Sequence, residues 1–361
     1  MTPRCDALPV VADAGDVRQR DELDWTRIAD HLRHSLTTGL VLGQLLDVKQ
    51  FTNGKANLTY LLRFEGRALV LRRPPHGQIA AGAHDMAREA RVLDALAPVY
   101  DLAPRSVLRC DDLAVCGTGF IVLEYREGVT LSRRPTAAAD HGASVRALAE
   151  AFVAGVADLH RLDAQRPGLR ELGRPDGFVD RQLRGWRRRW EQVATDEFDA
   201  RVRRTHAALV ARRPAPVAPA VVHMDLHLDN VLADPEHLDR PVALLDWDMA
   251  TLGDPRVDLG ILLAYWPDPS DPAPSPRVVH PSIGLMPLPG RAEVVELYRS
   301  AGGPDVTGLE WFEAFALWRN VIAIRQLVDR WESGASSDAD ILRVAAGLEG
   351  LLAAAAELVE A

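Results

Sequence analysis

The most constraining feature of this chain is the run of residues 221–232, in which His223, Asp225 and Asn230 lie between two pairs of apolar residues. The apolar pairs have the composition of short buried strands, which would hold the intervening loop rigid. The spacing from Asp225 to Asn230 fits a short loop that turns both side chains into one cleft. A second apolar stretch begins fourteen residues after Asn230 and leads into another carboxylate, Asp246.

The side-chain types of this pattern suit phosphoryl transfer from a nucleotide. A carboxylate accepts the proton of the acceptor hydroxyl as transfer proceeds, and Asp225 is the candidate for this base. Mg²⁺ prefers hard oxygen donors, and Asn230 and Asp246 are the candidate ligands. The alternative interpretation is that Asp225 only caps a turn and that Asn230 and Asp246 are ordinary polar residues at a turn and a strand end.

The two motifs resemble the His-Gly-Asp-x4-Asn and Ile-Asp-Trp-Glu motifs of the aminoglycoside phosphotransferase-like kinases, which are protein-kinase-fold enzymes that phosphorylate small molecules. The resemblance runs from about residue 40 to at least residue 330. Within this family, the chain is similar in detail to the branch related to the phosphotransferase domain that is fused to some acyl-CoA dehydrogenases. Four segments carry this similarity, at residues 51–60, 70–75, 83–89 and 253–259.

The resemblance implies an α+β chain with a bilobal protein-kinase-like fold. Residues 1–126 would form an N-terminal helix and a nucleotide-binding small lobe, built on an antiparallel β-sheet with one helix. Residues 127–361 would form a mainly helical large lobe with the catalytic loop and the acceptor site. The hydrophobic periodicity agrees with this division. It predicts strands at 45–51, 58–64, 68–72, 106–109 and 120–125, and helices at 24–36, 85–96, 142–162, 178–193, 197–212 and 257–265, followed by three C-terminal helical segments.

The resemblance also implies ATP and Mg²⁺ as cofactors. The lysine that usually contacts the phosphates from the third strand is absent here, because both lysines of the chain lie elsewhere. Strand alternation places Val70 and Arg72 on one face, so Arg72 would reach the phosphates and Glu89 on the next helix would pair with it. Arg73 would point the other way, as a surface charge. A plain surface ion pair between Arg72 and Glu89 is the alternative.

Two further segments are candidates for nucleotide binding. A turn over the phosphates would use backbone amides, and its residues are Asn53, Gly54 and Lys55. An Asn-Gly pair also occurs in ordinary hairpins, so this signal is weak by itself. The hinge would supply the backbone groups that bond adenine, and its residues are Leu123, Glu124 and Tyr125.

The resemblance gives supporting roles to residues around the catalytic loop. His223 would hold the loop backbone, although a catalytic role as a base or metal ligand also fits its chemistry. Asp258, in the segment Gly253-Asp254-Pro255-x2-Asp258, would tie the same backbone down. Met224 occupies the position that is usually Gly, so the loop geometry or the acceptor pocket can differ from the family pattern.

The helix predicted at 178–193 bears on the choice of acceptor. One of its faces is apolar and the other is basic, and the candidate substrate ligands on the basic face are Arg181, Arg184 and Arg188. In the fold that the chain resembles, the helices beyond the hinge wall the acceptor site. A basic wall suits an anionic acceptor, and the branch resemblance implies a hydroxyacyl-type one. A solvated helix face is the alternative.

Composition narrows the classes of partner. The formal net charge of −9 argues against a nucleic-acid binder, which is usually basic. No apolar run approaches the ~18 residues of a membrane span. The three cysteines show no metal-ligand spacing, and a reduced, cytoplasmic setting is the simple interpretation. We therefore expect a cytoplasmic monomer or homodimer whose partner is a small-molecule acceptor.

Three rival functions remain to be weighed. A nucleotide-binding pseudokinase would have lost the base or a metal ligand, whereas Asp225, Asn230 and Asp246 are all present. A kinase for aminoglycosides or other amino alcohols would favour acidic rather than basic walls. A metal hydrolase built on His223, Asp225 and His227 would need further closely spaced ligands, and the usual paired-histidine motifs are absent from the sequence.

Overall fold

The computed structural model describes residues 14–36, 40–51, 57–75, 86–131, 142–272, 275–277, 283, 286–334 and 340–360. The chain divides into two compact units. Unit 1 comprises Met1–Ala97 and Pro104–Arg126, and unit 2 comprises Pro98–Ala103 and Glu127–Ala361. Each unit is described below by itself.

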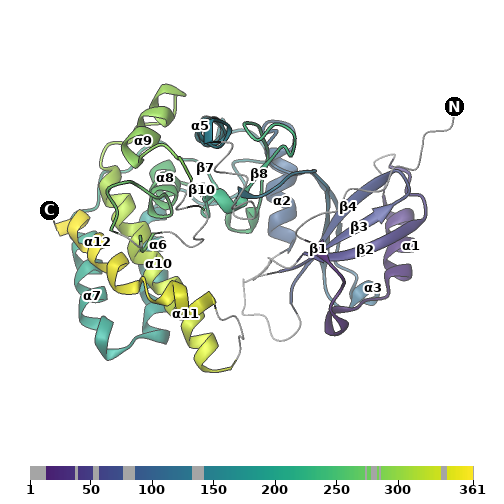
Figure 1. The fold of residues 1–361 in the computed structure, drawn as a ribbon, viewed down its shortest axis with the longest axis horizontal. Helices are drawn as coiled ribbons and strands as arrows, with labels where there is room; N and C mark the ends of the chain where they lie inside the picture. The colour runs from purple at the N-terminus through teal and green to yellow at the C-terminus, as the bar shows by residue number, and fades with distance from the viewer. Residues whose placement is uncertain are drawn as a thin grey trace. The chain divides into compact units, whose positions relative to one another are not determined.

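Unit 1 is built on a six-stranded antiparallel sheet with the strand order β1-β2-β3-β4-β6-β5 (Figure 1). Its strands are β1 (Ala14–Gly15), β2 (Leu45–Phe51), β3 (Leu58–Phe64), β4 (Arg67–Arg73), β5 (Ser106–Cys110) and β6 (Phe120–Glu124). Gly66 has a φ of 74° in the tight turn between β3 and β4, a conformation that glycine adopts without steric cost. The helices are α1 (Trp25–Ser35), α2 (Met86–Leu96) and the short α3 (Leu113–Cys116).

One face of this sheet packs against α1. Ile28 and Leu32 of α1 belong to the same buried cluster as Leu69 and Leu71 of β4. Arg73 alternates onto the face of Leu69 and Leu71, and only 2% of its surface is exposed. The prediction that Arg73 is a surface charge is therefore wrong. Strand alternation gave its direction correctly, but the periodicity does not show that α1 covers this face.

Unit 2 is mainly helical, with two small two-stranded antiparallel sheets. Its helices are α5 (Gly142–His160), α6 (Phe178–Val193), α7 (Asp196–Ala211), α8 (Pro255–Ala264), α9 (Arg291–Ser300), α10 (Leu309–Glu332), α11 (Asp340–Ala345) and α12 (Leu348–Glu360). Its strands are β7 (Ala220–Val222), β8 (Val231–Ala233), β9 (Pro241–Leu244) and β10 (Thr251–Gly253), in which β7 pairs with β10 and β8 with β9.

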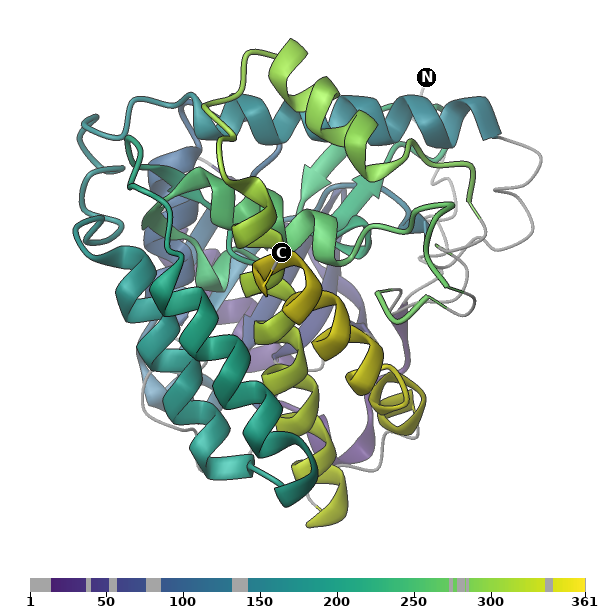
Figure 2. The same ribbon diagram turned by 90° about the vertical axis from the view of Figure 1, so that its left-hand side faces the viewer.

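The long helix α10 organises the helical part of unit 2. It packs against α8, α12, α6 and α7, and Figure 2 shows it between the α6–α7 pair and α12. Every residue of α8 is buried, including Arg256 and Asp258, and its second half is apolar throughout. Four helices rather than the predicted three follow residue 290, because a break at Ala346 and Gly347 separates α11 from α12. Within the described ranges, no helix combines the length and the apolar character that a membrane span requires.

Candidate active site

The loop that carries the candidate base is held between two buried strands. The strand β7 ends at Val222, and β8 begins at Val231 directly after a single 3-10 turn, Leu228–Asn230. The side-chain amide of Asn230 donates to the backbone carbonyl of Asp225 at 2.9 Å. The backbone carbonyl of Asn230 in turn accepts from the amide of Leu245 at 2.8 Å. The structure therefore joins Asp225, Asn230 and the residue before Asp246 in one hydrogen-bonded frame. The predicted short loop between two buried strands is present.

Asp258 fixes the start of this loop, which confirms its predicted contact. Its carboxylate is fully buried and accepts from the backbone amides of His223 at 2.5 Å and of Met224 at 2.7 Å. Asp258 lies in the first turn of α8, which Asp254 caps and Pro255 begins. The ring of His160 joins the network, because its Nε2 donates to Asp258 at 3.2 Å while its Nδ1 accepts from the hydroxyl of Tyr298 at 2.7 Å.

The ring of His223, a candidate catalytic residue, contacts the backbone of the loop. Its ring is fully buried, with Nε2 2.9 Å from the carbonyl of Leu245 and Nδ1 3.3 Å from the amide of Asp225. Both ring nitrogens are thus used by backbone groups, with Nε2 as the donor and Nδ1 as the acceptor. Burial lowers the pKa of His223, which favours this neutral form.

Two non-glycine residues have positive φ among the described residues, and both belong to this site. Met224 has a φ of 73° and Asp246 a φ of 69°. Left-handed backbone costs an L-residue on the order of 1 kcal/mol, and such strain clusters at functional sites. The value at Met224 also gives a physical reason why a glycine is usual at this position. The Met224 side chain is buried, so packing offsets the strain.

Asp225 lies in a basic environment formed by His227 and Arg319. The Nε2 of His227 is 3.6 Å from one carboxylate oxygen of Asp225, and the Nη2 of Arg319 is 3.9 Å from the other. Burial by itself would raise the pKa of Asp225, but the close contact with His227 and the charges of His227 and Arg319 outweigh it, so the pKa lies below its ordinary value. Burial by itself would lower the pKa of His227, but the neighbouring Asp225 carboxylate raises it above its ordinary value. The pair therefore favours a carboxylate beside an imidazolium.

The two candidate metal ligands have donor chemistry that fits Mg²⁺. Asn230 uses its side-chain nitrogen for the bond to Asp225, so its carbonyl oxygen is the atom that can face a cation. Asp246 lies just beyond β9 and precedes a 3-10 turn at Trp247–Met249. Among the described residues, no group of three or more His, Cys, Asp or Glu is arranged to hold a metal. An amide and one carboxylate suit Mg²⁺, which takes its remaining ligands from phosphates and water.

Within unit 1, the predicted pair of Arg72 and Glu89 is present. Arg72 on β4 donates through Nη1 to Oε1 of Glu89 on α2, and the Glu89 side chain is 1% exposed. The hinge strand β6 ends at Glu124, so Tyr125 is the first residue beyond the paired strand, and Leu123 pairs with Val70. The predicted phosphate turn, Asn53, Gly54 and Lys55, lies outside the described residues.

The predicted arginine-rich helix α6 has the expected two faces. The side chains of Leu183, Trp186 and Trp190 are buried, whereas the candidate ligands Arg181, Arg184 and Arg188 are exposed. Arg181 bonds the backbone carbonyls of Asp176 and Arg174 and so is committed to the preceding turn. A shallow hollow of about 390 Å³ lies on this helix, lined by Arg181, Gln182, Gly185, Trp186, Arg188, Arg189 and Gln192.

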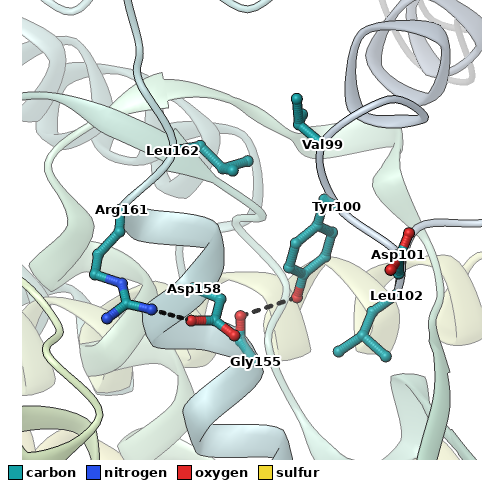
Figure 3. Close-up of a pocket in the computed structure, with 8 residues that line it drawn as sticks. All are labelled: Val99, Tyr100, Asp101, Leu102, Gly155, Asp158, Arg161 and Leu162. Atoms are coloured by element: carbon teal, nitrogen blue, oxygen red, sulfur yellow. Dashed lines mark hydrogen bonds and ion pairs between the residues drawn. The ribbon is translucent and has the colours of Figure 1, made fainter.

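A second hollow, of about 480 Å³, lies in unit 2 between residues 99–102 and the end of α5 (Figure 3). Tyr100 closes one side and donates to the carbonyl of Gly155 at 3.1 Å. Arg161 bonds Asp158 on the opposite side. None of the predicted site residues lines this hollow.

Sequence reasoning missed Arg319 and Tyr265, which approach the loop from α10 and the end of α8. The ring of Tyr265 lies 5.4 Å from that of His227, between centroids. Burial raises the pKa of Tyr265 to about 12, so its hydroxyl stays a hydrogen-bond donor. One signal could have found Arg319: together with Asn320 it interrupts an otherwise apolar run, residues 314–322, and buried charges are usually functional or paired.

Comparison with known proteins identifies relatives of this chain. The model of the phosphotransferase enzyme family matches residues 47–294. The chain is 28% identical over 296 residues to acyl-CoA dehydrogenase family member 10 of Mus musculus, covering 81% of the chain and 27% of that protein. It is 28% identical over 278 residues to family member 11 of Gallus gallus, covering 76% of the chain and 35% of that protein. The chain thus spans about a third of the length of these curated relatives.

Solved structures share the fold. An aminoglycoside phosphotransferase-like protein from Ralstonia eutropha matches with a TM-score of 0.75 at 25% identity, covering 94% of this chain and 99% of that one. The aminoglycoside phosphotransferase APH(4)-Ia, solved with ADP and hygromycin B, matches with a TM-score of 0.61 at 15% identity, covering 91% and 98%. The predicted α+β, protein-kinase-like fold and the predicted family resemblance are therefore confirmed.

Proposed function

Because the chain belongs to the phosphotransferase enzyme family, we propose that it is a kinase that uses Mg-ATP to phosphorylate a hydroxyl group of a small molecule. One observation carries this proposal. Asp225 is held by a hydrogen-bonded loop, with the Asn230 side chain bonded to its backbone carbonyl. The amide of Leu245, the residue before Asp246, bonds the carbonyl of Asn230 in the same loop. A base and two oxygen ligands are the groups that the reaction needs from the protein.

Asp225 would orient the acceptor hydroxyl and accept its proton. A carboxylate with a lowered pKa is a weak base, which suits a loose transition state in which the proton leaves late. His227 and Arg319 keep this carboxylate ionised, and Asp258 fixes the loop that carries it. The protein's contribution is then mainly positioning and charge, as expected for phosphoryl transfer.

Asn230 and Asp246 would hold Mg²⁺ through the side-chain carbonyl and the carboxylate. When bound, the ion supplies charge compensation for the nucleotide phosphates. Arg72, oriented by Glu89, would contact the phosphates in place of the usual lysine.

The remaining predicted nucleotide contacts stay part of this proposal. They are the turn formed by Asn53, Gly54 and Lys55 and the hinge backbone of Leu123, Glu124 and Tyr125. The ADP complex of APH(4)-Ia supports a nucleotide ligand for this fold.

An anionic, hydroxyacyl-type acceptor is the finer part of the proposal. The sequence relatives are acyl-CoA dehydrogenase family members, which supports an acceptor from acyl chemistry. The basic face of α6 supports an anion over a polycation such as an aminoglycoside, with Arg184 and Arg188 as its candidate ligands, since Arg181 bonds the preceding turn.

Acceptor-stimulated release of ADP tests the proposed function. The acceptors are hydroxyacyl-CoA esters, free hydroxy acids, aminoglycosides, choline and homoserine, each with Mg-ATP. We expect stimulation by at least one hydroxy acid or ester and its loss in the Asp225→Asn variant. Binding of ATP without stimulation by any acceptor would instead support a nucleotide-binding regulatory module.

A further inference from the structure

Arg319 is a buried arginine whose charge the described residues only partly neutralise. It lies on α10 with 5% of its surface exposed. Its Nε and Nη1 have no hydrogen-bond partner among the described residues. Its Nη2 is 3.9 Å from Asp225 and 4.0 Å from the sulfur of Met249. A distance of 3.9 Å is longer than a hydrogen bond, so buried donors of a permanent cation remain unsatisfied, which is costly.

A second arginine adds to the positive charge at this point. The guanidinium carbons of Arg189 and Arg319 lie 4.3 Å and 5.1 Å from the ring of Trp186. Within the described part of the chain, Arg189 forms no ion pair with a carboxylate. Partial burial and the charge of Arg319 lower the pKa of Arg189, although Arg189 is exposed to solvent. The buried guanidinium of Arg319, with the exposed Arg189 near the same ring and the Asp225 carboxylate no closer than 3.9 Å, leaves an excess of positive charge that favours an anion.

We propose that Arg319 binds a carboxylate of the acceptor and so selects hydroxy acids over neutral and cationic alcohols. The proposal rests on the proposed function, since it takes Asp225 to be the group that meets the reacting hydroxyl. An acceptor carboxylate would satisfy the open N–H groups of Arg319 and offset the repulsion by Arg189. Because Arg319 lies beside Asp225, binding this group would also bring the acceptor hydroxyl to the base.

Arg319 has a competing structural explanation, in which it only fixes α10 against α6 through Trp186. Contacts between a guanidinium and an indole do stabilise such packing. A purely structural residue would affect every acceptor alike. A specificity residue changes the preference between a carboxylate and its neutral isostere, so this preference separates the two explanations.

The experiment compares hydroxy acids of three to six carbons with their primary amides as acceptors. Steady-state ADP release and direct calorimetric binding are measured for the wild type, Arg319→Met, Arg319→Lys and Arg330→Met. Methionine keeps the apolar length without the charge, and lysine keeps the charge without the planar fork. Arg330 is an exposed arginine on the same helix and is the matched control.

We expect Arg319→Met to lower kcat/KM for the best hydroxy acid by about 10- to 100-fold more than for the matched amide, because bonds to the charged carboxylate are lost only with the acid. Any change in the charge state of Asp225 lowers kcat/KM for both acceptors alike. Arg319→Lys should recover part of this loss, and Arg330→Met and the KM for ATP should not change. If Arg319→Met lowers kcat/KM equally for the acid and the amide, the proposal that Arg319 binds a carboxylate is overturned and the kinase function stays intact. Conversely, carboxylate binding that depends on Arg319 without ADP release by the wild type would overturn the kinase function alone.

Discussion

Replacing Asp258 with asparagine tests the network that holds the catalytic loop. The carboxylate accepts three hydrogen bonds, from the amides of His223 and Met224 and from the ring of His160. Asparagine keeps one acceptor oxygen and turns an NH₂ group toward a donor, so at least one charge-assisted bond is lost. Such a bond contributes about 1.5–3 kcal/mol. Since Asp258 is fully buried, solvent does not compensate, and we expect unfolding to require about 2–3 kcal/mol less free energy.

Urea unfolding followed by circular dichroism measures this loss, with Asp329→Asn as the control. Asp329 is exposed on α10, and its replacement should stay within about 0.5 kcal/mol of the wild type. The turnover number of Asp258→Asn should also fall, by about 100-fold if the loop shifts on the order of 1 Å. A loss of stability below about 1 kcal/mol, with normal turnover, would refute the reasoning that this carboxylate holds the loop.

Two further substitutions have defined outcomes. At Met224, where φ is 73°, the glycine variant should be at least as stable as the alanine variant in urea unfolding. At Leu226, which is not in the positive-φ region, the glycine variant should be about 0.5–1 kcal/mol less stable than the alanine variant. A glycine variant that is less stable than the alanine variant at both positions would contradict the backbone strain assigned to Met224. His227→Gln removes the partner that lowers the pKa of Asp225, so the acid limb of the kcat/KM profile for ADP release should move to higher pH. In the wild type the stabilisation of this pair is lost as pH falls through the lowered pKa of Asp225 or rises through the raised pKa of His227. An acid limb that stays in place would show that His227 does not set the charge state of the base.

Local patterns in the sequence were sufficient to predict many of the helices and strands and the position of the loop that carries Asp225. The strands β2 and β3 and the helix α6 have the predicted bounds, because their residues alternate or repeat with clear periods. The spacing of Asp225 and Asn230 between two apolar pairs also predicted a short loop between buried strands, and β7 and β8 flank this loop.

Features that depend on distant segments could not be predicted in this way. Arg73 was expected at the surface and is buried, because α1 covers its face of the sheet. Arg319 is far from Asp225 in sequence, and only the packing of α10 brings the two together. The positive φ of Asp246 has no signal in the apolar pattern of its strand. Tertiary packing, and not local propensity, decides these positions.

The measurement that tests the central claim most directly is a phosphorus-31 NMR spectrum of the reaction with Mg-ATP and the best acceptor of the panel. The account predicts a new phosphate monoester resonance that grows with ADP for the wild type and is absent for Asp225→Asn, while that variant still binds ATP. Inorganic phosphate as the only new product, or an unchanged monoester yield in Asp225→Asn, would contradict the assignment of Asp225 as the base for transfer to a hydroxyl.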